Sequence, residues 1–424
     1  MNKYSKFFRL SYTFFIVSLL LFFVSLISLT SCVEAQSSCD TTSYKWKASP
    51  HDSMYINSVA ISGDGGKVVG GTFFHSYSAT RRDEKKEVPD FVNTQTATFG
   101  TYCYDSTGTV LWKDEFYGWE GVYWVDISED GNYAASGGWY SNNPYTGFVF
   151  AYDANNGNKI LDFKTSARVN EVSLSSDGTY LISASGNVNL FQLINGKYQV
   201  ADTFKFSSKT DAAVSAAISA NGETIVFSDY DGFIYVCKNE SGKFSLLKKW
   251  ALPNTGFCRC VRVTPDGKSF AAGGTPGYFY LFDLESLLKS GEPAATFSTG
   301  ESGMIYGVAI TDDGSGVIGI TNYKPYSSEG GYVYYFSKSD TLKWKFYTNR
   351  NPNSASINSA KGIVAVADGH PDGSPGDYYL IDINTGKCKW SYQTNNMSWP
   401  IQISQNGNAI AAGSDDSNIY YFVP

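Results

Sequence analysis

One short phrase recurs along this chain: an apolar run of strand length, a turn that ends in glycine, and a second apolar run. VAISGDGGKVVGG begins at Val59, and near-copies begin at Val125, Val261 and Val308. The turn glycines, including a degenerate copy at Gly362, are Gly65, Gly131, Gly178, Gly222, Gly267, Gly314, Gly362 and Gly407. They are 44 to 48 residues apart, except for a first interval of 66. Such a period indicates a repeat architecture with one supersecondary unit per repeat.

The phrase itself is that of a β-hairpin. An Asp-Gly or Asn-Gly pair supplies the positive φ that a tight turn needs, and the flanking runs have strand length. A third and a fourth run follow in most repeats, for example FVFAYD at Phe148 and LKWKF at Leu342. Four strands in about 45 residues, with no helical pattern between them, predict an all-β chain built as a β-propeller.

Eight turns predict eight blades, but the last repeat supplies only three strands before Pro424. The missing strand is found near the other end of the chain, in YKWKAS at residues 44–49, which looks like LKWKFY. If this strand completes the last blade, no long sheet edge stays unpaired. We therefore predict an eight-bladed β-propeller closed by pairing of the N-terminal strand with the last blade. It forms a single domain over residues 44–424, with an insert at 74–98 in the first blade.

The segment LIDINTGKCKW, residues 380–390, resembles the tryptophan-docking repeat of quinoprotein-type (PQQ-like) propellers. The matching positions are Asp382, Thr385, Gly386 and Trp390. YDSTGTVLW from Tyr104 fits less completely, and the hairpin phrase also resembles WD40 repeats. The resemblance implies the propeller fold, with the first strand of each blade innermost. It implies little about activity, because one fold serves many functions.

The first 32 residues have the layout of an export signal, with basic residues before an uncharged apolar run at 12–29. The run leads into LTSC, which resembles the lipobox of bacterial lipoproteins, where the cysteine, here Cys32, is lipidated. Cleavage after VEA at 33–35 would instead give a secreted protein, and an uncleaved run would anchor the chain. All three place the rest of the chain outside the cytoplasm, with 33–43 as a linker. We expect a cell-envelope protein tethered to the membrane through its N-terminus.

The resemblance also implies where a ligand binds. Loops between the second and third strands of a blade (B–C loops) share one face with the connections between blades (D–A loops), and ligands of propellers usually bind there. Four B–C loops are long, at residues 74–98, 138–147, 322–331 and 368–377, and ring order brings them to one side of that face. The candidate ligand-binding residues are Trp119, Trp139, Tyr140, Tyr145, Tyr323, Tyr326 and Arg350. Their composition is typical of binding surfaces, although the rings could instead pack against their own loops.

The sequence contains few features that indicate catalysis. The histidines, His51, His75 and His370, are isolated, and we expect them on solvated loops. No nucleophile elbow, P-loop, zinc spacing or adjacent cysteine pair is present, so no catalytic residue, metal or cofactor is predicted. Most cysteines after Cys32 are interpreted as small buried residues. Cys258 and Cys260 are poorly placed to bridge each other.

The formal net charge of −7 argues against nucleic acid as a partner. The sequence favours a monomeric, non-catalytic propeller that binds a protein or glycan ligand on the B–C and D–A face. Two alternatives remain. One is an enzyme, either a quinoprotein-like dehydrogenase or a carbohydrate-active enzyme. The other is a scaffold like the outer-membrane propeller lipoprotein that supports barrel assembly.

Overall fold

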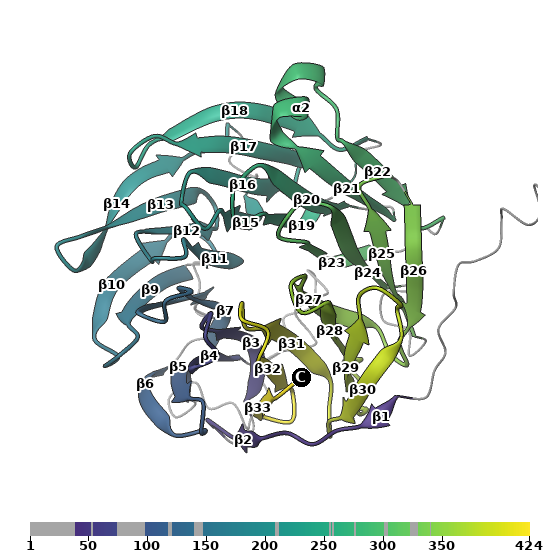
Figure 1. Ribbon diagram of the computed structural model, residues 1–424. Helices are drawn as coiled ribbons and strands as arrows, with labels where there is room; N and C mark the ends of the chain where they lie inside the picture. The colour runs from purple at the N-terminus through teal and green to yellow at the C-terminus, as the bar shows by residue number, and fades with distance from the viewer. Residues whose placement is uncertain are drawn as a thin grey trace, which may run out of the picture. The chain divides into compact units, whose positions relative to one another are not determined.

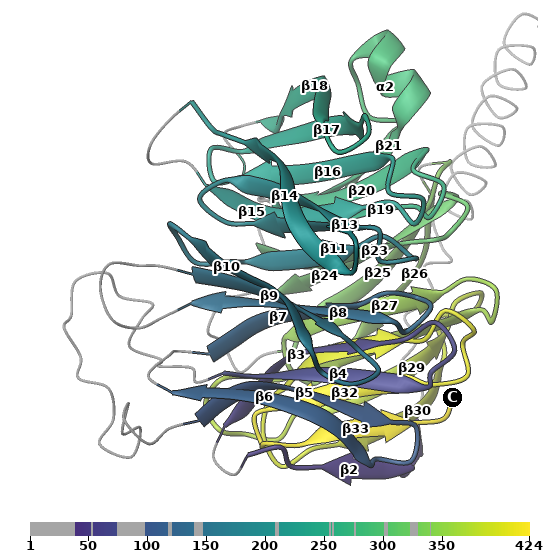
Figure 2. The same cartoon turned by 90° about the vertical axis from the view of Figure 1, so that its left-hand side faces the viewer.

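β-strands make up most of the described chain and form mainly antiparallel sheets, most of them four-stranded, so the all-β prediction is confirmed. The computed structural model describes residues 39–51, 54–73, 98–117, 121–139, 147–207, 212–253, 256, 258–274, 277–300, 304–322, 330–339 and 341–424. The sheets follow one another around a common centre, and the first strand of each four-strand group lies innermost (Figure 1). Figure 2 shows the same sheets from the side. The arrangement is propeller-like.

The first eight strands after the N-terminal segment form one sheet. It consists of two antiparallel groups of four joined through the pair Phe73–Gly121. The first group is β3 (Tyr55–Ile61), β4 (Lys67–Phe73), β5 (Thr98–Asp105) and β6 (Val110–Tyr117). The second group is β7 (Gly121–Ile127), β8 (Tyr133–Trp139), β9 (Gly147–Asp153) and β10 (Lys159–Thr165).

Three four-stranded sheets follow in chain order. The first is β11 (Glu171–Leu174), β12 (Tyr180–Ala184), β13 (Val188–Ile194) and β14 (Lys197–Phe204). The second is β15 (Ala213–Ile218), β16 (Thr224–Asp229), β17 (Phe233–Asn239) and β18 (Phe244–Ala251). The third is β19 (Cys258–Val263), β20 (Ser269–Gly274), β21 (Tyr278–Asp283) and β22 (Ala295–Ser298), with the short helix α2 (Leu284–Ser290) before its last strand.

The remaining strands form three sheets, two of which include N-terminal strands. One is β23 (Met304–Ile310), β24 (Gly316–Asn322), β25 (Tyr332–Ser337) and β26 (Thr341–Tyr347). The next is β27 (Pro352–Asn358), β28 (Ile363–Asp368), β29 (Asp377–Asp382) and β30 (Cys388–Gln393), extended by β1 (Asp40–Thr41). The last is β31 (Ser398–Ile403), β32 (Ile410–Ser414) and β33 (Ile419–Phe422), extended by β2 (Trp46–Ala48). Among the described residues, no helix is long and apolar enough to cross a membrane.

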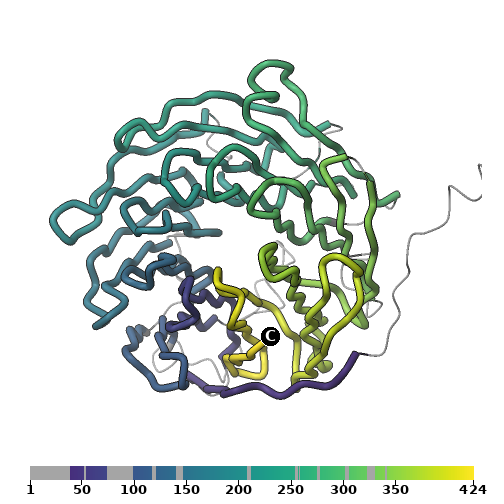
Figure 3. Tube along the Cα trace, viewed as in Figure 1, coloured from purple at the N-terminus to yellow at the C-terminus, as the bar shows by residue number. Residues whose placement is uncertain are grey.

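The N-terminal segment 39–48, which we call the strap, runs along the outer edges of two sheets. β1 pairs in parallel with β30, and β2 pairs antiparallel with β33, the last strand of the chain. The trace therefore brings the beginning of the described chain beside its end (Figure 3). A disulfide joins Cys39 to Cys388 across 349 residues of sequence. Residues 40–41, within the segment 33–43 that we expected to be a linker, form the strand β1.

The repeated hairpin turns have the conformation that the sequence predicts. All eight turn glycines have φ between +65° and +76°, the region that favours glycine. In the first turn, the Ser62 hydroxyl donates to Asp64 Oδ1 (2.6 Å), and the same oxygen accepts from the Gly66 N–H (2.8 Å). The Lys67 N–H donates to Ser62 Oγ (2.9 Å). The turn is therefore a local hydrogen-bonded unit that the sequence encodes almost by itself.

Turns of neighbouring sheets also bond to each other. The Gly63 N–H donates to the Glu129 carbonyl (2.8 Å), and the Ser176 N–H donates to the Ala220 carbonyl (2.9 Å). The Asn406 N–H of the last sheet donates to the Gly63 carbonyl of the first (2.9 Å). The turn end of the sheets is thus occupied by structural bonds, as expected for a phrase that serves folding.

The turn aspartates predict a loss of stability in acid. Hydrogen bonds lower the pKa of Asp64, Asp266 and Asp313, chiefly from Ser62, the Lys268 N–H and Ser315 respectively. A carboxylate whose pKa is lower in the folded state stabilises that state above its unfolded value, near 4. This contribution disappears as the pH falls through the folded values. We expect the thermal midpoint to fall as the pH is lowered from 6 to 3, as measured by circular dichroism.

A triple variant, D64N/D266N/D313N, isolates this effect. Two other turns already carry asparagine: Ser219 donates to Asn221 Oδ1 (2.6 Å), and Ser404 donates to Asn406 Oδ1 (2.8 Å). The variant should therefore fold at pH 7 and lose less of its midpoint in acid than the wild type. An equal acid response in both proteins would show that other carboxylates control it.

Innermost strands are sheet edges, and side chains of the neighbouring sheet satisfy their free N–H groups. Ser58 Oγ accepts from the Val125 N–H (3.0 Å), and Ser215 Oγ accepts from the Val261 N–H (3.1 Å). Gln402 Oε1 of the last sheet accepts from the Ile61 N–H of the first (3.1 Å). These bonds hold adjacent sheets in a fixed position around the centre.

Apolar side chains fill the space between consecutive sheets. One such cluster includes Val226 of β16 and Phe270 of β20. Another joins the first and the last sheets through Ile56 and Ile419, which are fully buried. The core is therefore divided among the interfaces between sheets.

Tryptophans of outer strands pack on glycine turns of the next sheet. Trp112 donates from Nε1 to the Ala154 carbonyl (2.9 Å), and a Cβ added to Gly157 would lie 2.7 Å from the Trp112 side chain. Only glycine permits this contact. Trp344 packs on Gly386 in the same way, and Trp46 of the strap packs on Gly108. The pattern resembles tryptophan docking, although the partner of Gly386 comes from the preceding sheet.

Candidate ligand-binding site on the innermost strands

Most innermost strands contain a β-bulge near their first residues, at the end opposite the hairpin turns. The pairing register shifts between Val122 and Trp124 in β7, between Cys258 and Cys260 in β19, and between Ile305 and Gly307 in β23. Similar shifts occur in β3, β15, β27 and β31. A bulge leaves one extra residue unpaired and turns its side chain in a new direction.

The extra residues differ in their side chains. Asn57 and Asn353 donate from Nδ2 to carbonyls of the next sheet, at Tyr123 (2.7 Å) and Ser398 (2.8 Å), and so have a structural role. Tyr123, Arg259 and Tyr306 instead contact arginine or aromatic side chains. With Trp139 and Arg168 they form what we call the arginine–aromatic cluster: Tyr123, Trp139, Arg168, Arg259 and Tyr306.

Arg168 lies against two aromatic rings. Its guanidinium carbon is 3.8 Å from the ring centroid of Tyr123 and 3.9 Å from that of Trp139. The two rings are nearly parallel, at 21°, with centroids 5.8 Å apart, and Phe73 packs edge-on against both. Tyr123, Trp139 and Arg168 are all partly exposed. Cation–π contacts of this kind hold a guanidinium in one orientation.

Arg259 approaches the same group from the other side of the centre. Its guanidinium carbon is 4.7 Å from the Tyr306 ring centroid. Burial raises the pKa of the Tyr123 phenol, but the positive charges of Arg168 and Arg259 outweigh burial, so the net shift is downward. Both guanidinium groups therefore act on one phenol oxygen.

Beside the cluster is an ion pair that crosses from β19 to β11. Arg262 donates to Glu171 Oε1 (2.8 Å), and Glu171 Oε2 accepts from the Ser215 hydroxyl and the Ala216 N–H. The Glu171 side chain is 7% exposed and that of Arg262 is 34% exposed, so water still reaches the arginine. Both oxygens of the Glu171 carboxylate therefore already have partners.

The charges of the cluster itself are not neutralised in this way. Among the described residues, no carboxylate forms an ion pair with Arg168 or Arg259, and Arg168 Nε is buried without a hydrogen-bond partner. Asp126 lies near the ion pair: burial raises its pKa to about 7, although it accepts N–H bonds from Leu174 and Ile127. The arrangement can hold an anion or stack a flat, partly apolar group.

Only two of the predicted binding residues fall in the described part of the chain. Trp139 is in the cluster, packed on Tyr123 and Arg168 and still partly exposed. Arg350 lies elsewhere, and its N–H donates to Asp368 Oδ2 (2.9 Å). The residues that lie outside the described residues are Trp119, Tyr140, Tyr145, Tyr323 and Tyr326, together with the proposed lipidation site Cys32.

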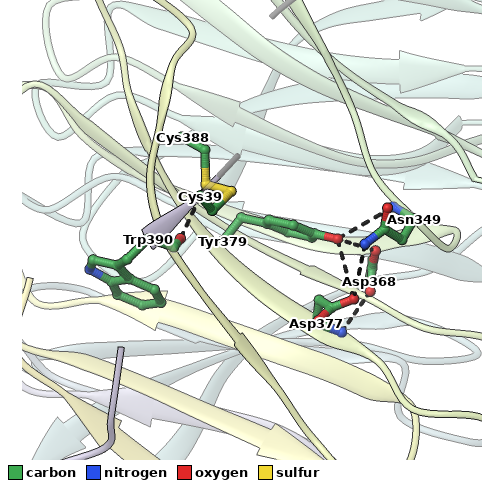
Figure 4. Close-up of a disulfide and its surroundings, with 7 residues drawn as sticks. All are labelled: Cys39, Asn349, Asp368, Asp377, Tyr379, Cys388 and Trp390. Carbon is green, nitrogen blue, oxygen red and sulfur yellow. Dashed lines mark hydrogen bonds between the residues drawn. A yellow bond between two sulfur atoms is a disulfide. The ribbon is translucent and has the colours of Figure 1, made fainter. Parts of the chain in front are cut away.

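The surroundings of Arg350 form a buried acidic group (Figure 4). Asp368 is fully buried and accepts from the Asp377 N–H (2.7 Å) and the Tyr379 hydroxyl (3.0 Å). Burial and the nearby Asp377 raise its pKa to about 7. Asp229 accepts from the Phe233 N–H and the Tyr235 hydroxyl in the same pattern, so we assign both aspartates a structural role in their hairpins.

One expectation about the remaining polar residues differs from the structure. His370, expected on a solvated loop, is 9% exposed, and its Nδ1 lies 3.2 Å from Asp372 Oδ2. Cys39 and Cys388 form a disulfide that sequence spacing did not indicate. The four free cysteines are buried, as expected: Cys103, Cys237, Cys258 and Cys260.

Sequence reasoning missed most of the arginine–aromatic cluster. One signal was available: the described residues contain only four arginines, Arg168, Arg259, Arg262 and Arg350, in a chain with 33 basic residues. Three of the four gather around Tyr123 and Glu171. The bulges that direct Tyr123, Arg259 and Tyr306 have no recognisable pattern in the sequence.

A scan against protein-family models finds no match, and a search of the curated proteins finds no similar sequence. Within the described ranges, no group of histidine, cysteine, aspartate and glutamate side chains is arranged to hold a metal ion. The function must therefore be argued from the cluster and its chemistry.

Proposed function

We propose that residues 44–424 form an eight-bladed β-propeller of the tryptophan-docking type, closed by the N-terminal strand. Three contacts between the two ends of the chain support closure: the β2–β33 pairing, the shared core of Ile56 and Ile419, and the stacking of Trp46 on Tyr421. The eight hairpin turns support the blade number. A closed ring of blades leaves only short, protected sheet edges.

The proposed protein is exported and tethered to the cell envelope by its N-terminus. The apolar run at 12–29 and the LTSC sequence at Cys32 support this, and both lie outside the described residues. The disulfide Cys39–Cys388 supports it independently, because disulfides persist in oxidising compartments.

The propeller functions as a monomeric binding module for a glycan or protein ligand, without catalysis. The observation that supports this most is the arginine–aromatic cluster, which combines partly exposed rings with guanidinium groups that have no carboxylate partner. Aromatic rings and arginines are the residues that most often dominate binding energy. The opposite end of the sheets is occupied by bonds between turns, so it offers less for recognition.

One observation favours the enzyme alternative. Asp126 is next to the Glu171–Arg262 pair, and its pKa of about 7 suits a general acid or base. A quinoprotein-like or carbohydrate-active enzyme would use such a group. Release of product from a bound glycan, or turnover after addition of quinone and Ca²⁺, would favour this alternative.

Binding is tested on a glycan array and with immobilised extracellular proteins, using the wild type and Trp139→Ala. We expect Trp139→Ala to weaken binding at least tenfold, because its ring orients Arg168 and Tyr123. Tyr347→Ala is the matched control, since Tyr347 lies on the outer strand β26 and is 36% exposed. Equal affinity of Trp139→Ala and the wild type would refute the site.

A further inference from the structure

We propose that the arginine–aromatic cluster binds the carboxylate of an acidic saccharide, with Arg168 and Arg259 as the residues that recognise the anion. The inference deepens the proposed function and depends on it. It specifies the ligand as a glycan that carries uronic acid, and it separates residues that contact the charge from the ring that contacts the sugar.

The distribution of charge is the first reason. The formal net charge of the chain is −7, so an uncompensated cluster of positive charge is unusual in it. Arg262 is neutralised by Glu171, but within the described ranges no carboxylate pairs with Arg168 or Arg259. Both cations act on the Tyr123 phenol, and neither has a counter-ion among the described residues. An anion bound near both would be attracted to each of them.

The orientation of Arg168 is the second reason. Its guanidinium carbon lies 3.8 Å from the Tyr123 ring centroid and 3.9 Å from that of Trp139, so the two rings hold the group in place. The Arg168 Nε–H is buried and has no partner, which is costly unless a ligand supplies one. A guanidinium edge matches a carboxylate through two parallel hydrogen bonds.

The net charge of the arginines and carboxylates around Tyr123 favours a ligand that presents a single carboxylate. Arg168, Arg259 and Arg262 contribute three positive charges, and Glu171 removes one. Asp126, with a pKa of about 7, removes up to one more at neutral pH. The remaining charge is between one and two, which suits a monoanion better than a phosphate dianion.

The rings favour a sugar over an acidic peptide. Trp139 and Tyr123 are partly exposed and nearly parallel, with Phe73 packed edge-on against both. Saccharides present flat, apolar C–H faces that pack on exposed rings, and a uronic acid carries its carboxylate on the same ring. One residue of an acidic glycan can therefore contact Trp139 while its carboxylate reaches Arg168.

Calorimetry on the mature domain tests the proposal with three probes: oligogalacturonate, the same oligosaccharide with its carboxyl groups reduced to alcohols, and oligoglutamate. We expect binding of the first alone, weakened by salt because ionic contacts are screened. Arg168→Gln and Arg259→Gln should each weaken it at least tenfold. Lys389→Gln, at an exposed position on the outer strand β30, is the control for loss of a positive charge and should bind like the wild type.

If Arg168→Gln fails to fold, the variant Arg168→Lys still tests the proposal. It keeps the charge but not the two-pronged edge, so it should fold and still bind several-fold more weakly than the wild type. Binding of oligoglutamate without oligogalacturonate would overturn the proposal, and so would equal binding of the acidic and reduced sugars. If a neutral glycan binds, and its binding requires Trp139 but neither arginine, this inference is refuted. The proposed function as a binding module would still hold.

Discussion

Trp46→Ala is expected to lower the free energy of unfolding by about 3 to 5 kcal/mol, the range for removing a large buried aromatic side chain. Trp46 is 8% exposed and stacks on Tyr421 of the last strand. It also donates from Nε1 to the Ser106 carbonyl (3.1 Å) and packs on Gly108. One ring thus connects the strap, the first sheet and the last sheet. Urea unfolding followed by circular dichroism measures the change.

Two variants separate the causes of this loss. Trp46→Phe keeps most of the packing but loses the hydrogen bond, so it should cost clearly less than the alanine variant. Leu111→Ala, at a position 41% exposed on β6, is the surface control and should change stability little. If Trp46→Ala unfolds like Leu111→Ala, the strap does not contribute to the stability of the sheets.

Removing the disulfide in the double variant C39S/C388S is expected to cost about 2 to 5 kcal/mol. The bond connects residues 349 apart in sequence, and a long loop closed in the unfolded chain removes much of its conformational entropy. In the folded chain the bond holds the strap on β30. Thermal unfolding with and without a reducing agent measures the effect.

The double variant supplies its own control. A reducing agent should lower the midpoint of the wild type but leave that of C39S/C388S unchanged. Cys237→Ala removes a buried free thiol and should keep the response of the wild type to reduction. Full reduction of the wild type, shown by thiol titration, with no change of midpoint would contradict this role of the disulfide.

Local chemistry explains why the hairpins could be predicted. In most turns a serine or threonine, an aspartate or asparagine and a glycine bond to one another within six residues, as at Ser62 and Asp64. Such bonds form in any sheet and depend on no distant residue. The same holds for the loop around Asp382, which accepts bonds from Thr385 and precedes Gly386.

The remaining features could not be predicted because they depend on contacts between segments far apart in the sequence. The resemblance of residues 380–390 to a docking repeat does not identify the ring that packs on Gly386, and in the structure that ring is Trp344. The partner is set by the packing of successive sheets. Likewise, Cys39 meets Cys388 only because β1 runs beside β30.

The sequence by itself determined the repeat, the hairpin turns and the all-β architecture, because each depends on residues close together in the chain. Only the tertiary structure decided which side chains share the centre. Tyr123 and Arg259 come from two different sheets, where bulges in β7 and β19 direct them, and Arg168 comes from the connection between β10 and β11. A bulge changes where a side chain points without changing the alternating pattern around it. The candidate site is therefore a property of how the sheets assemble.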